Sequence, residues 1–301
     1  MPQHNDIAPA QAVGAASMVA PIRRLLLHHA RDAFRDQTTV DREWKPLRYT
    51  GRPDFEQAVA DYEAFVACFR PFEVEILFLP PDEATTLDAL YVRDAAVLAH
   101  DGAILGNMGK DARRGEPAAL GAYLKRLGVP ILGTVTGTGR LEGGDVVWLD
   151  ERTLAVGQGY RTNAEGIRQL AAILGDRVDA VIPVPLPHWN GPADVLHLMS
   201  LLSPVDHDRA VVYARLLPVP FRERLLERGL RLIEVPDDEF DALGCNVLAV
   251  APRRALMADS APKTRALLEK AGIAVQTYPA AEISGKGQGG PTCLTQPLWR
   301  A

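Results

Sequence analysis

The sequence predicts an α/β fold: a five-bladed α/β propeller of ββαβ units with pseudo-five-fold symmetry. Three observations support this prediction. From Ile22 onward, short apolar strand-like runs alternate with helical runs whose apolar residues recur at intervals of three or four. A strand–strand–helix–strand order occurs four times in succession, and the segments left over at the two ends supply the elements of a fifth unit. Since 47% of the residues are hydrophobic, such a chain can bury a large core.

The four internal units follow one pattern. The first starts with a hairpin signal at His100-Asp-Gly102. A helix with proline in its first turn and a further strand come next. The elements expected in the four units are Leu90–Ala99, Ala103–Gly106, Pro117–Arg126 and Val129–Gly133; Val146–Leu149, Thr153–Val156, Asn163–Leu174 and Val178–Val184; Val195–Leu202, Arg209–Ala214, Pro220–Arg228 and Arg231–Val235; and Asn246–Val250, Ala255–Ala258, Pro262–Ala271 and Ala274–Tyr278.

The fifth unit combines the two ends of the sequence. A short strand after Cys293 joins a strand at Ile22–Leu27, a helix at Phe55–Phe69 and a strand at Val74–Leu79. The ring is then closed by the N- and C-terminal strands. The units share almost no residue identity, so the repeat is one of structural pattern.

Composition limits the domain organisation and the class of partner. We expect one catalytic domain over residues 21–301 and a disordered or loosely attached tail over residues 1–20, which are small, polar and without periodicity. The net charge of −5 and the lack of a basic stripe argue against nucleic acid. No secretory signal and no long apolar run occur, so we expect no membrane association and a cytoplasmic location. The three cysteines form no CxxC pair, and we expect neither a metal nor a cofactor.

Reactive residue types recur where each unit enters its first strand. Asp94, Asp145, His197, Asn246 and Cys293 follow one another at intervals of about 50 residues. Each alone has an ordinary structural explanation: a capping aspartate, a core histidine or a packed cysteine. Equivalent positions of a pseudo-symmetric ring converge on its axis, however. Together they predict one central pocket, in which Asp145 and Asn246 are expected to contact the substrate. Glu142 adds a further carboxylate to this pocket.

The expected pocket favours a planar cationic substrate. Carboxylates bind guanidinium through paired, charge-assisted hydrogen bonds. A cysteine with an ordinary pKa is only about 3% thiolate at neutral pH, and nearby carboxylates lower that fraction. A bound guanidinium or a protonated histidine reverses the effect. Covalent Cys–His catalysis at an amidine carbon is the favoured reaction class.

These residues resemble the guanidino-group-modifying superfamily of arginine deiminases, amidinotransferases and dimethylarginine dimethylaminohydrolases, which has the same propeller fold. The resemblance covers about residues 22 to 298. The matching motifs are Tyr91-Val-Arg-Asp94, Leu141-Glu-Gly-Gly-Asp145, Gly159-Tyr-Arg-Thr-Asn163, Leu196-His-Leu198 and Gly289-Gly-Pro-Thr-Cys-Leu-Thr295.

The resemblance implies a role for each matching residue. Cys293 is the nucleophile, and His197 protonates the leaving amine and then activates water. Glu142 and Asp94 hold the guanidinium nitrogens, and Glu142 also has a catalytic role in orienting the reacting groups. Asp88 is a further acid in contact with the substrate. The residues that match binders of the substrate carboxylate are Arg161 and one of Arg113 or Arg114.

Two positions bear on the substrate. Met199 stands where arginine deiminases carry a second guanidinium-binding aspartate, and the absence of this acid favours N-methylated arginine as the substrate. The expected reaction converts it to citrulline and methylamines through a thiouronium intermediate. Arg93 instead favours a deiminase or an amidinotransferase, since the dimethylarginine enzymes commonly have an acidic residue at this position. An arginine deiminase or dihydrolase, or an amidinotransferase, is therefore the alternative. The expected partner is a small guanidino compound, with a homodimer kept as an option.

Three other interpretations of the sequence have less support. Asp206-His-Asp208 would suit a metal-dependent ureohydrolase, yet the further spaced ligands are missing and a polar hairpin turn fits better. The glycine-rich run from Gly285 to Gly290 has no Gly-Lys-Ser/Thr and no following helix for a phosphate cradle. A binding protein for cationic amino acids would use the same pocket without turnover.

Overall fold

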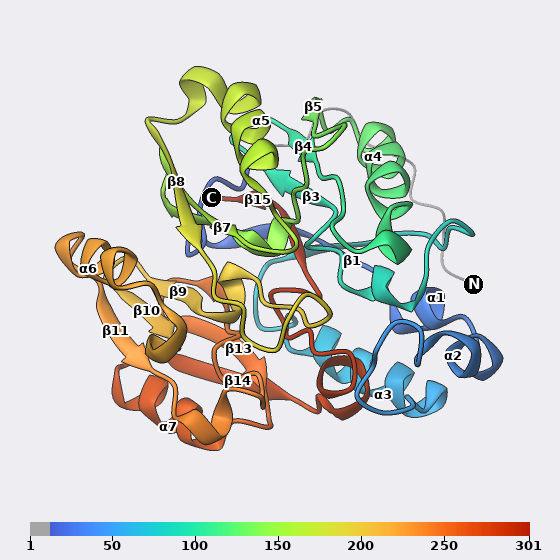
Figure 1. The fold of residues 1–301 in the computed structure, drawn as a ribbon. Helices are drawn as coiled ribbons and strands as arrows, with labels where there is room; N and C mark the ends of the chain where they lie inside the picture. The colour runs from blue at the N-terminus through green and yellow to red at the C-terminus, as the bar shows by residue number, and fades with distance from the viewer. Residues whose placement is uncertain (1–12) are drawn as a thin grey trace.

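The computed structural model describes residues 13–301, and their strands form five separate three-stranded sheets (Figure 1). In every sheet the central strand pairs antiparallel with one neighbour and parallel with the other. The sheets are β3(Ala96–Leu98)–β4(Ala103–Leu105)–β5(Ile131–Thr134), β6(Val146–Asp150)–β7(Thr153–Gln158)–β8(Ala180–Pro185), β9(Leu202–Asp206)–β10(Arg209–Val212)–β11(Arg231–Glu234), β12(Leu248–Ala251)–β13(Arg254–Ala258)–β14(Ala274–Tyr278) and β15(Gln296–Arg300)–β1(Ile22–Leu27)–β2(Glu75–Phe78).

A helix connects the two parallel strands of each sheet, because parallel neighbours need a crossover connection. These helices are α4(Glu116–Arg126), α5(Ala164–Leu174), α6(Val219–Glu227), α7(Pro262–Lys270) and α3(Phe55–Ala67). Figure 1 shows them at the periphery of the molecule, with the strands toward its middle. Two short helices not expected from the sequence, α1(Ala30–Phe34) and α2(Gln37–Glu43), precede α3. Among residues 13–301, none of the helices combines the length and apolar character needed to span a bilayer.

The fifth sheet joins the first and last strands, as predicted. In its register Leu25 of β1 lies opposite Pro297 of β15 and Leu26 lies opposite Gln296. Consecutive side chains of a strand point to opposite faces, and both leucines are fully buried, so both faces of β1 are covered. The segment that carries Cys293 leads directly into β15 and is therefore anchored at the sheet that holds both ends.

Residues 13–20, which we expected to belong to a disordered or loosely attached tail, form backbone hydrogen bonds with the rest of the protein. The amide of Gly14 donates to Leu298 O at 2.9 Å, and the amide of Arg300 donates to Gly14 O at 2.9 Å. Ala15 N donates to Ala99 O at 3.0 Å. These backbone bonds add the segment to the edge of the β15 sheet. The rest of the expected tail, residues 1–12, lies outside the described residues.

Two expected strands begin later than the sequence suggested. The run expected at Leu90–Ala99 is a strand only over Ala96–Leu98, after a 3₁₀ turn at Leu87–Leu90. The run expected at Val195–Leu202 contains the 3₁₀ turn Leu198–Ser200, and β9 starts at Leu202. Buried turns carry the same apolar residues as strands, so composition alone does not separate them.

The start of α5 provides a test of the fold. Asn163 caps this helix: its Oδ1 accepts from Gly166 N at 2.9 Å and from Arg140 N at 3.0 Å, and its Nδ2 donates to Thr138 O at 2.8 Å. We expect Asn163→Ala to lower the free energy of unfolding by about 1–3 kcal/mol, measured by chemical denaturation. Asn163→Asp keeps both accepted bonds and should lose less. Equal stability of Asn163→Ala and the wild type would contradict this role.

Candidate active site

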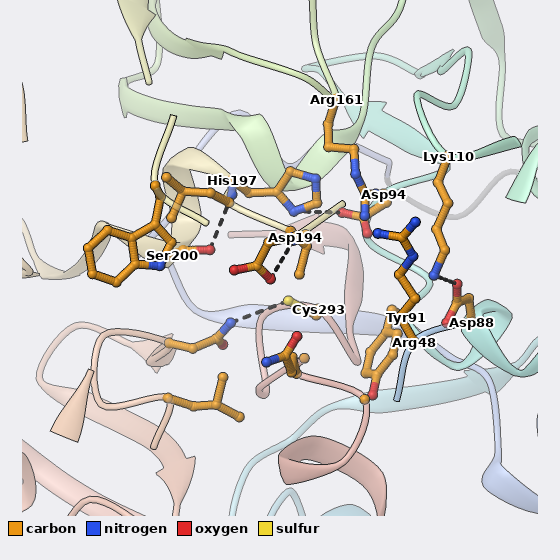
Figure 2. A pocket seen from close by; sticks show the side chains of 18 of the residues that line it. Arg48, Asp88, Tyr91, Asp94, Lys110, Arg161, Asp194, His197, Ser200 and Cys293 are labelled. Atoms are coloured by element: carbon orange, nitrogen blue, oxygen red, sulfur yellow. Dashed lines mark hydrogen bonds and ion pairs between the residues drawn. The ribbon is translucent and has the colours of Figure 1, made fainter. Parts of the chain in front are cut away.

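A pocket of about 120 Å³ is lined by loops that lead into the first strands of several sheets (Figure 2). Most of the predicted site residues lie on its wall: Asp88, Asp94, Arg113, Arg161, His197, Asn246 and Cys293. Glu142 and Asp145 are fully buried behind the wall. Arg114 lies away from the pocket on the exposed surface, where its Nη2 is 2.7 Å from Asp111 Oδ1. Of the two arginines that matched a carboxylate binder, only Arg113 therefore reaches the pocket.

Cys293 is partly buried and held in a turn immediately before β15. Its amide donates to Gly290 O at 3.0 Å, and Asn246 Nδ2 donates to its Sγ at 3.3 Å. Asn246 Oδ1 accepts from both the amide and the hydroxyl of Thr292, at 3.0 and 2.8 Å, so one side chain fixes the turn and touches the thiol. A Cβ at Gly290 would lie 2.5 Å from Asn246 Cγ, and only glycine leaves room for this contact.

The surroundings of Cys293 keep its thiol protonated. Burial raises the pKa of Cys293, and the negative charge of Asp94 raises it further. The hydrogen bonds from Asn246 and Thr292 and the charge of Arg93 oppose this shift without cancelling it. These shifts favour the protonated thiol, so positive charge in the pocket has to assist the formation of a thiolate.

Glu142 is the buried carboxylate to which two pocket side chains are attached. Its Oε2 accepts from Arg161 Nη1 at 2.8 Å and from His197 Nε2 at 2.8 Å. Its Oε1 accepts from the amides of Gly109 and Lys110 at 2.9 and 3.3 Å. Burial alone would raise the pKa of Glu142, but Arg161 and His197 hold it well below the usual range. Glu142 thus stays ionised and orients both side chains.

His197 precedes the 3₁₀ turn Leu198–Ser200 and is almost fully buried. Burial favours its neutral form, yet the charges of Asp94 and Asp145 and the hydrogen bond with Glu142 raise its pKa to about 9. Its Nδ1 lies 3.8 Å from Asp94 Oδ1. At neutral pH the ring is an imidazolium that can donate a proton into the pocket.

Asp94 and Arg113 form a buried ion pair. Asp94 Oδ2 accepts from Arg113 Nη1 at 2.5 Å, while its Oδ1 accepts from Gly144 N at 3.0 Å. Arg113 also binds both carboxylate oxygens of Glu116, at 2.8 and 2.7 Å. Most donors of Arg113 are thus already used. Its main effect here is to hold the Asp94 carboxylate in place at the pocket wall.

Asp145 supports the site from behind. Its Oδ1 accepts from Leu198 N at 3.0 Å, which fixes the turn that carries His197. Its Oδ2 has no hydrogen-bond partner within residues 13–301, and burial raises its pKa to about 6. The direct substrate contact expected for Asp145 does not agree with this position.

Several wall residues were not singled out from the sequence. Lys110 Nζ donates to Asp88 Oδ2 at 2.6 Å and to Leu47 O at 2.8 Å, so Asp88 faces the pocket as an ion pair. Arg48 and Asp194 place opposite charges on the wall. Asp194 stands three residues before His197, a spacing that could have pointed to it, whereas Lys110 and Arg48 come from irregular loops without a local signal. Cys245, the residue before Asn246, is buried and also lines the pocket.

Ligand atoms of Asp94, Glu142 and His197 lie within 4.8 Å of one another, a spacing that a metal ion could use. The carboxylates are already bound by Arg113 and Arg161, whose charges a divalent cation would have to displace.

The other suggested metal motif has a structural role. Asp206 ends β9 and pairs with Arg209 at 3.0 Å and Arg253 at 2.5 Å. His207 and Asp208 form the turn to β10, so the prediction of a polar hairpin turn is confirmed.

The sheet arrangement and the grouping of a cysteine, a histidine and carboxylates define a protein of the guanidino-group-modifying class. Known proteins agree with this class. The chain is similar to N(G),N(G)-dimethylarginine dimethylaminohydrolase of Streptomyces coelicolor, with 31% identity over 80% of this chain and 86% of the relative. It is 27% identical to the enzyme of the same name from Pseudomonas aeruginosa, over 82% of this chain and 91% of the relative.

A solved structure shares the fold. The structure of a mutant dimethylarginine dimethylaminohydrolase from Pseudomonas aeruginosa, complexed with citrulline, superimposes with a TM-score of 0.74 at 23% identity and covers 91% of this chain and 98% of that one. The family model described as N,N dimethylarginine dimethylhydrolase, eukaryotic, matches residues 33–300. The chain belongs to this dimethylarginine dimethylhydrolase family.

The raised pKa of His197 has a measurable effect on stability. A group whose pKa rises on folding stabilises the protein below its unfolded pKa, here 6.5, and loses this contribution as the pH rises to about 9. We expect the free energy of unfolding to fall over this range by roughly 2–3 kcal/mol more in the wild type than in His197→Gln. Denaturant titrations at the two pH values measure both slopes, and identical slopes would refute the shift.

Proposed function

We propose that this protein hydrolyses N-methylated arginine to citrulline and a methylamine, with Cys293 as the nucleophile and His197 as the proton donor. The observation that carries the proposal is the single pocket in which the Cys293 thiol, the His197 ring and carboxylates meet (Figure 2). Membership of the dimethylarginine dimethylhydrolase family supports the same reaction. The Pseudomonas aeruginosa relative binds citrulline, the product named here.

Asp94 is proposed to hold the substrate guanidinium, and the Asp88–Lys110 pair is proposed to contact another part of the substrate. Asp94 lies on the wall as a nearly buried carboxylate, the group that a planar cation requires. Arg161 also lines the pocket and keeps donors beyond the one bound to Glu142, so it remains the candidate binder of the substrate carboxylate.

The arriving substrate is proposed to activate the nucleophile. Its positive charge offsets Asp94 and favours loss of the Cys293 proton to solvent. The thiolate then attacks the guanidinium carbon. The tetrahedral adduct collapses as His197 gives its proton to the leaving dimethylamine, which produces an S-alkylthiouronium bound to Cys293.

Water completes the reaction. Neutral His197 accepts a proton from a water molecule, which attacks the thiouronium carbon. The C–S bond breaks, and the products are the ureido group of citrulline and the regenerated Cys293 side chain. Glu142 assists both steps, because its hydrogen bond favours the imidazolium form of His197.

The two positions that pointed to different substrates have different surroundings. Met199 is buried in the apolar core, so it adds no second guanidinium-binding acid. Arg93 is not on the pocket wall: its Nε donates to Thr292 O at 3.0 Å, behind Cys293. An arginine at this position is therefore compatible with a methylated substrate, and the support for dimethylarginine over arginine comes from Met199 and from membership of the family.

The finer features of the fold and assembly belong to the same proposal. We regard the five sheets as the blades of a five-bladed propeller closed by β1 and β15, within one catalytic domain over residues 21–301. Absence of nucleic acid as a partner, a cytoplasmic location and a homodimer stay as predictions.

Product analysis tests the reaction directly. Purified protein is offered asymmetric dimethylarginine, monomethylarginine, arginine and agmatine in buffer with a chelator, and the products are identified by mass spectrometry. We expect citrulline and dimethylamine, and a loss of roughly 10³-fold or more in Cys293→Ser, because a hydroxyl is a much poorer nucleophile than a thiolate.

Cys68→Ser is the matched control, since Cys68 lies at the end of α3 and away from the pocket wall, and it should stay active. Turnover of arginine alone would replace the proposal with a deiminase or dihydrolase. Inhibition by the chelator would favour a ureohydrolase. Binding without any turnover would indicate a binding protein.

A further inference from the structure

A second, smaller cavity of about 20 Å³ lies next to the candidate active site and shares none of its wall residues. Its wall includes Arg93, Gln296 and Arg300, together with Ala15, Ser17 and Met18 of the N-terminal segment. Arg93 is the chain neighbour of Asp94, and Gly143, also on this wall, is the neighbour of Glu142. The cavity therefore lies directly behind the residues that form the pocket.

The two arginines of this cavity are buried charges with incomplete compensation. Arg300 donates from Nη1 to Ala20 O at 2.6 Å and from Nη1 and Nη2 to Ala249 O at 3.0 Å, which leaves its Nε–H unused. Arg93 donates to Thr292 O and Thr295 Oγ1 at 3.0 and 3.4 Å. All these acceptors are neutral, and within residues 13–301 neither guanidinium forms a salt bridge.

Burying two like charges side by side is costly. Burial lowers the pKa of Arg93 to about 10 and that of Arg300 to about 9, and the charge of Arg93 adds to the shift at Arg300. Such buried charges normally have a counter-ion. The carboxylate of Asp94 offsets part of the charge of Arg93, but it is itself bound by Arg113.

Gln296 adds an unpartnered polar group to the same wall. Its side chain is 1% exposed, and its Oε1 has no hydrogen-bond partner in the described part of the chain. Rotation of the amide about its last torsion presents either the oxygen or the two N–H donors of Nε2 to the cavity. With Nε2 turned inward, its two N–H donors join two guanidinium groups, those of Arg93 and Arg300, on the wall of the same cavity.

We propose that this cavity is a binding site for one small monovalent anion of the size of chloride, held by Arg93, Arg300 and Gln296. The volume is enough for a single occupant of about the size of a water molecule, which excludes sulfate and phosphate. Such an anion neutralises the guanidinium groups. It also stabilises the turn of Cys293, because Arg93 binds Thr292 O through Nε and Cys293 O through its amide at 3.2 Å.

The test uses the full chain and does not depend on its activity. Thermal unfolding is followed in sodium chloride, sodium bromide and sodium gluconate at equal ionic strength. Ligand binding to the folded state raises the melting temperature, so we expect the wild type to melt roughly 2–4 °C higher in chloride or bromide than in gluconate. Anomalous diffraction from crystals grown in bromide should show one bromide ion between the two guanidinium groups.

Gln296→Glu is the decisive variant, because it retains the shape of the side chain and supplies a carboxylate in place of the anion. It should melt at the same temperature in all three salts and bind no bromide. Gln158→Glu, an exposed position at the end of β7, makes the same chemical change elsewhere and should keep the wild-type response. Equal salt responses of the wild type and Gln296→Glu, or a cavity without bromide that holds only water, would overturn the proposal.

Discussion

The fully buried carboxylate of Glu142 is the constraint on which the candidate site depends. A charge in the interior is tolerated only with partners, and this one is bound by two side chains and two backbone amides. Those partners belong to loops of different sheets, so the same bonds that compensate the charge also fix the relative positions of the sheets. Removing one partner would leave an uncompensated charge in the core and lower the stability of the fold. The stability of the fold and the geometry of the site therefore depend on the same bonds.

The order of helices and strands could largely be predicted from the sequence, because the patterns that indicate them are local. Hairpin turns, helix starts and alternating apolar runs recur in each unit, and they predicted even the sheet built from both ends of the chain. The segments around Leu90 and His197 were assigned as strands, but the structure has 3₁₀ turns there. In both segments, the residue that reaches the site lies in an irregular stretch just before the first strand. This stretch is as apolar as a strand, so composition does not distinguish the two.

The candidate site was predictable to the extent that it follows the repeat. Asp94, His197, Asn246 and Cys293 meet in one pocket as equivalent positions, whereas Asp145, although at the equivalent position, faces inward and supports the histidine turn. Lys110 and the ion pair of Arg113 with Glu116 result from contacts between loops, which no local pattern encodes. The same holds for the approach of Arg93 to Arg300, since these residues are brought together only by the folded chain.

The pairing of β1 with β15 has a consequence for biosynthesis. During translation β1 is made well before β15, so its antiparallel neighbour is missing until β15 has followed. Contacts between such distant segments are slow to form, so β1 keeps an unpaired apolar edge until β15 packs against it. Cys293 lies a few residues ahead of β15, so its position depends on this late pairing. A chain in which β1 and β15 have not yet paired therefore lacks the assembled pocket.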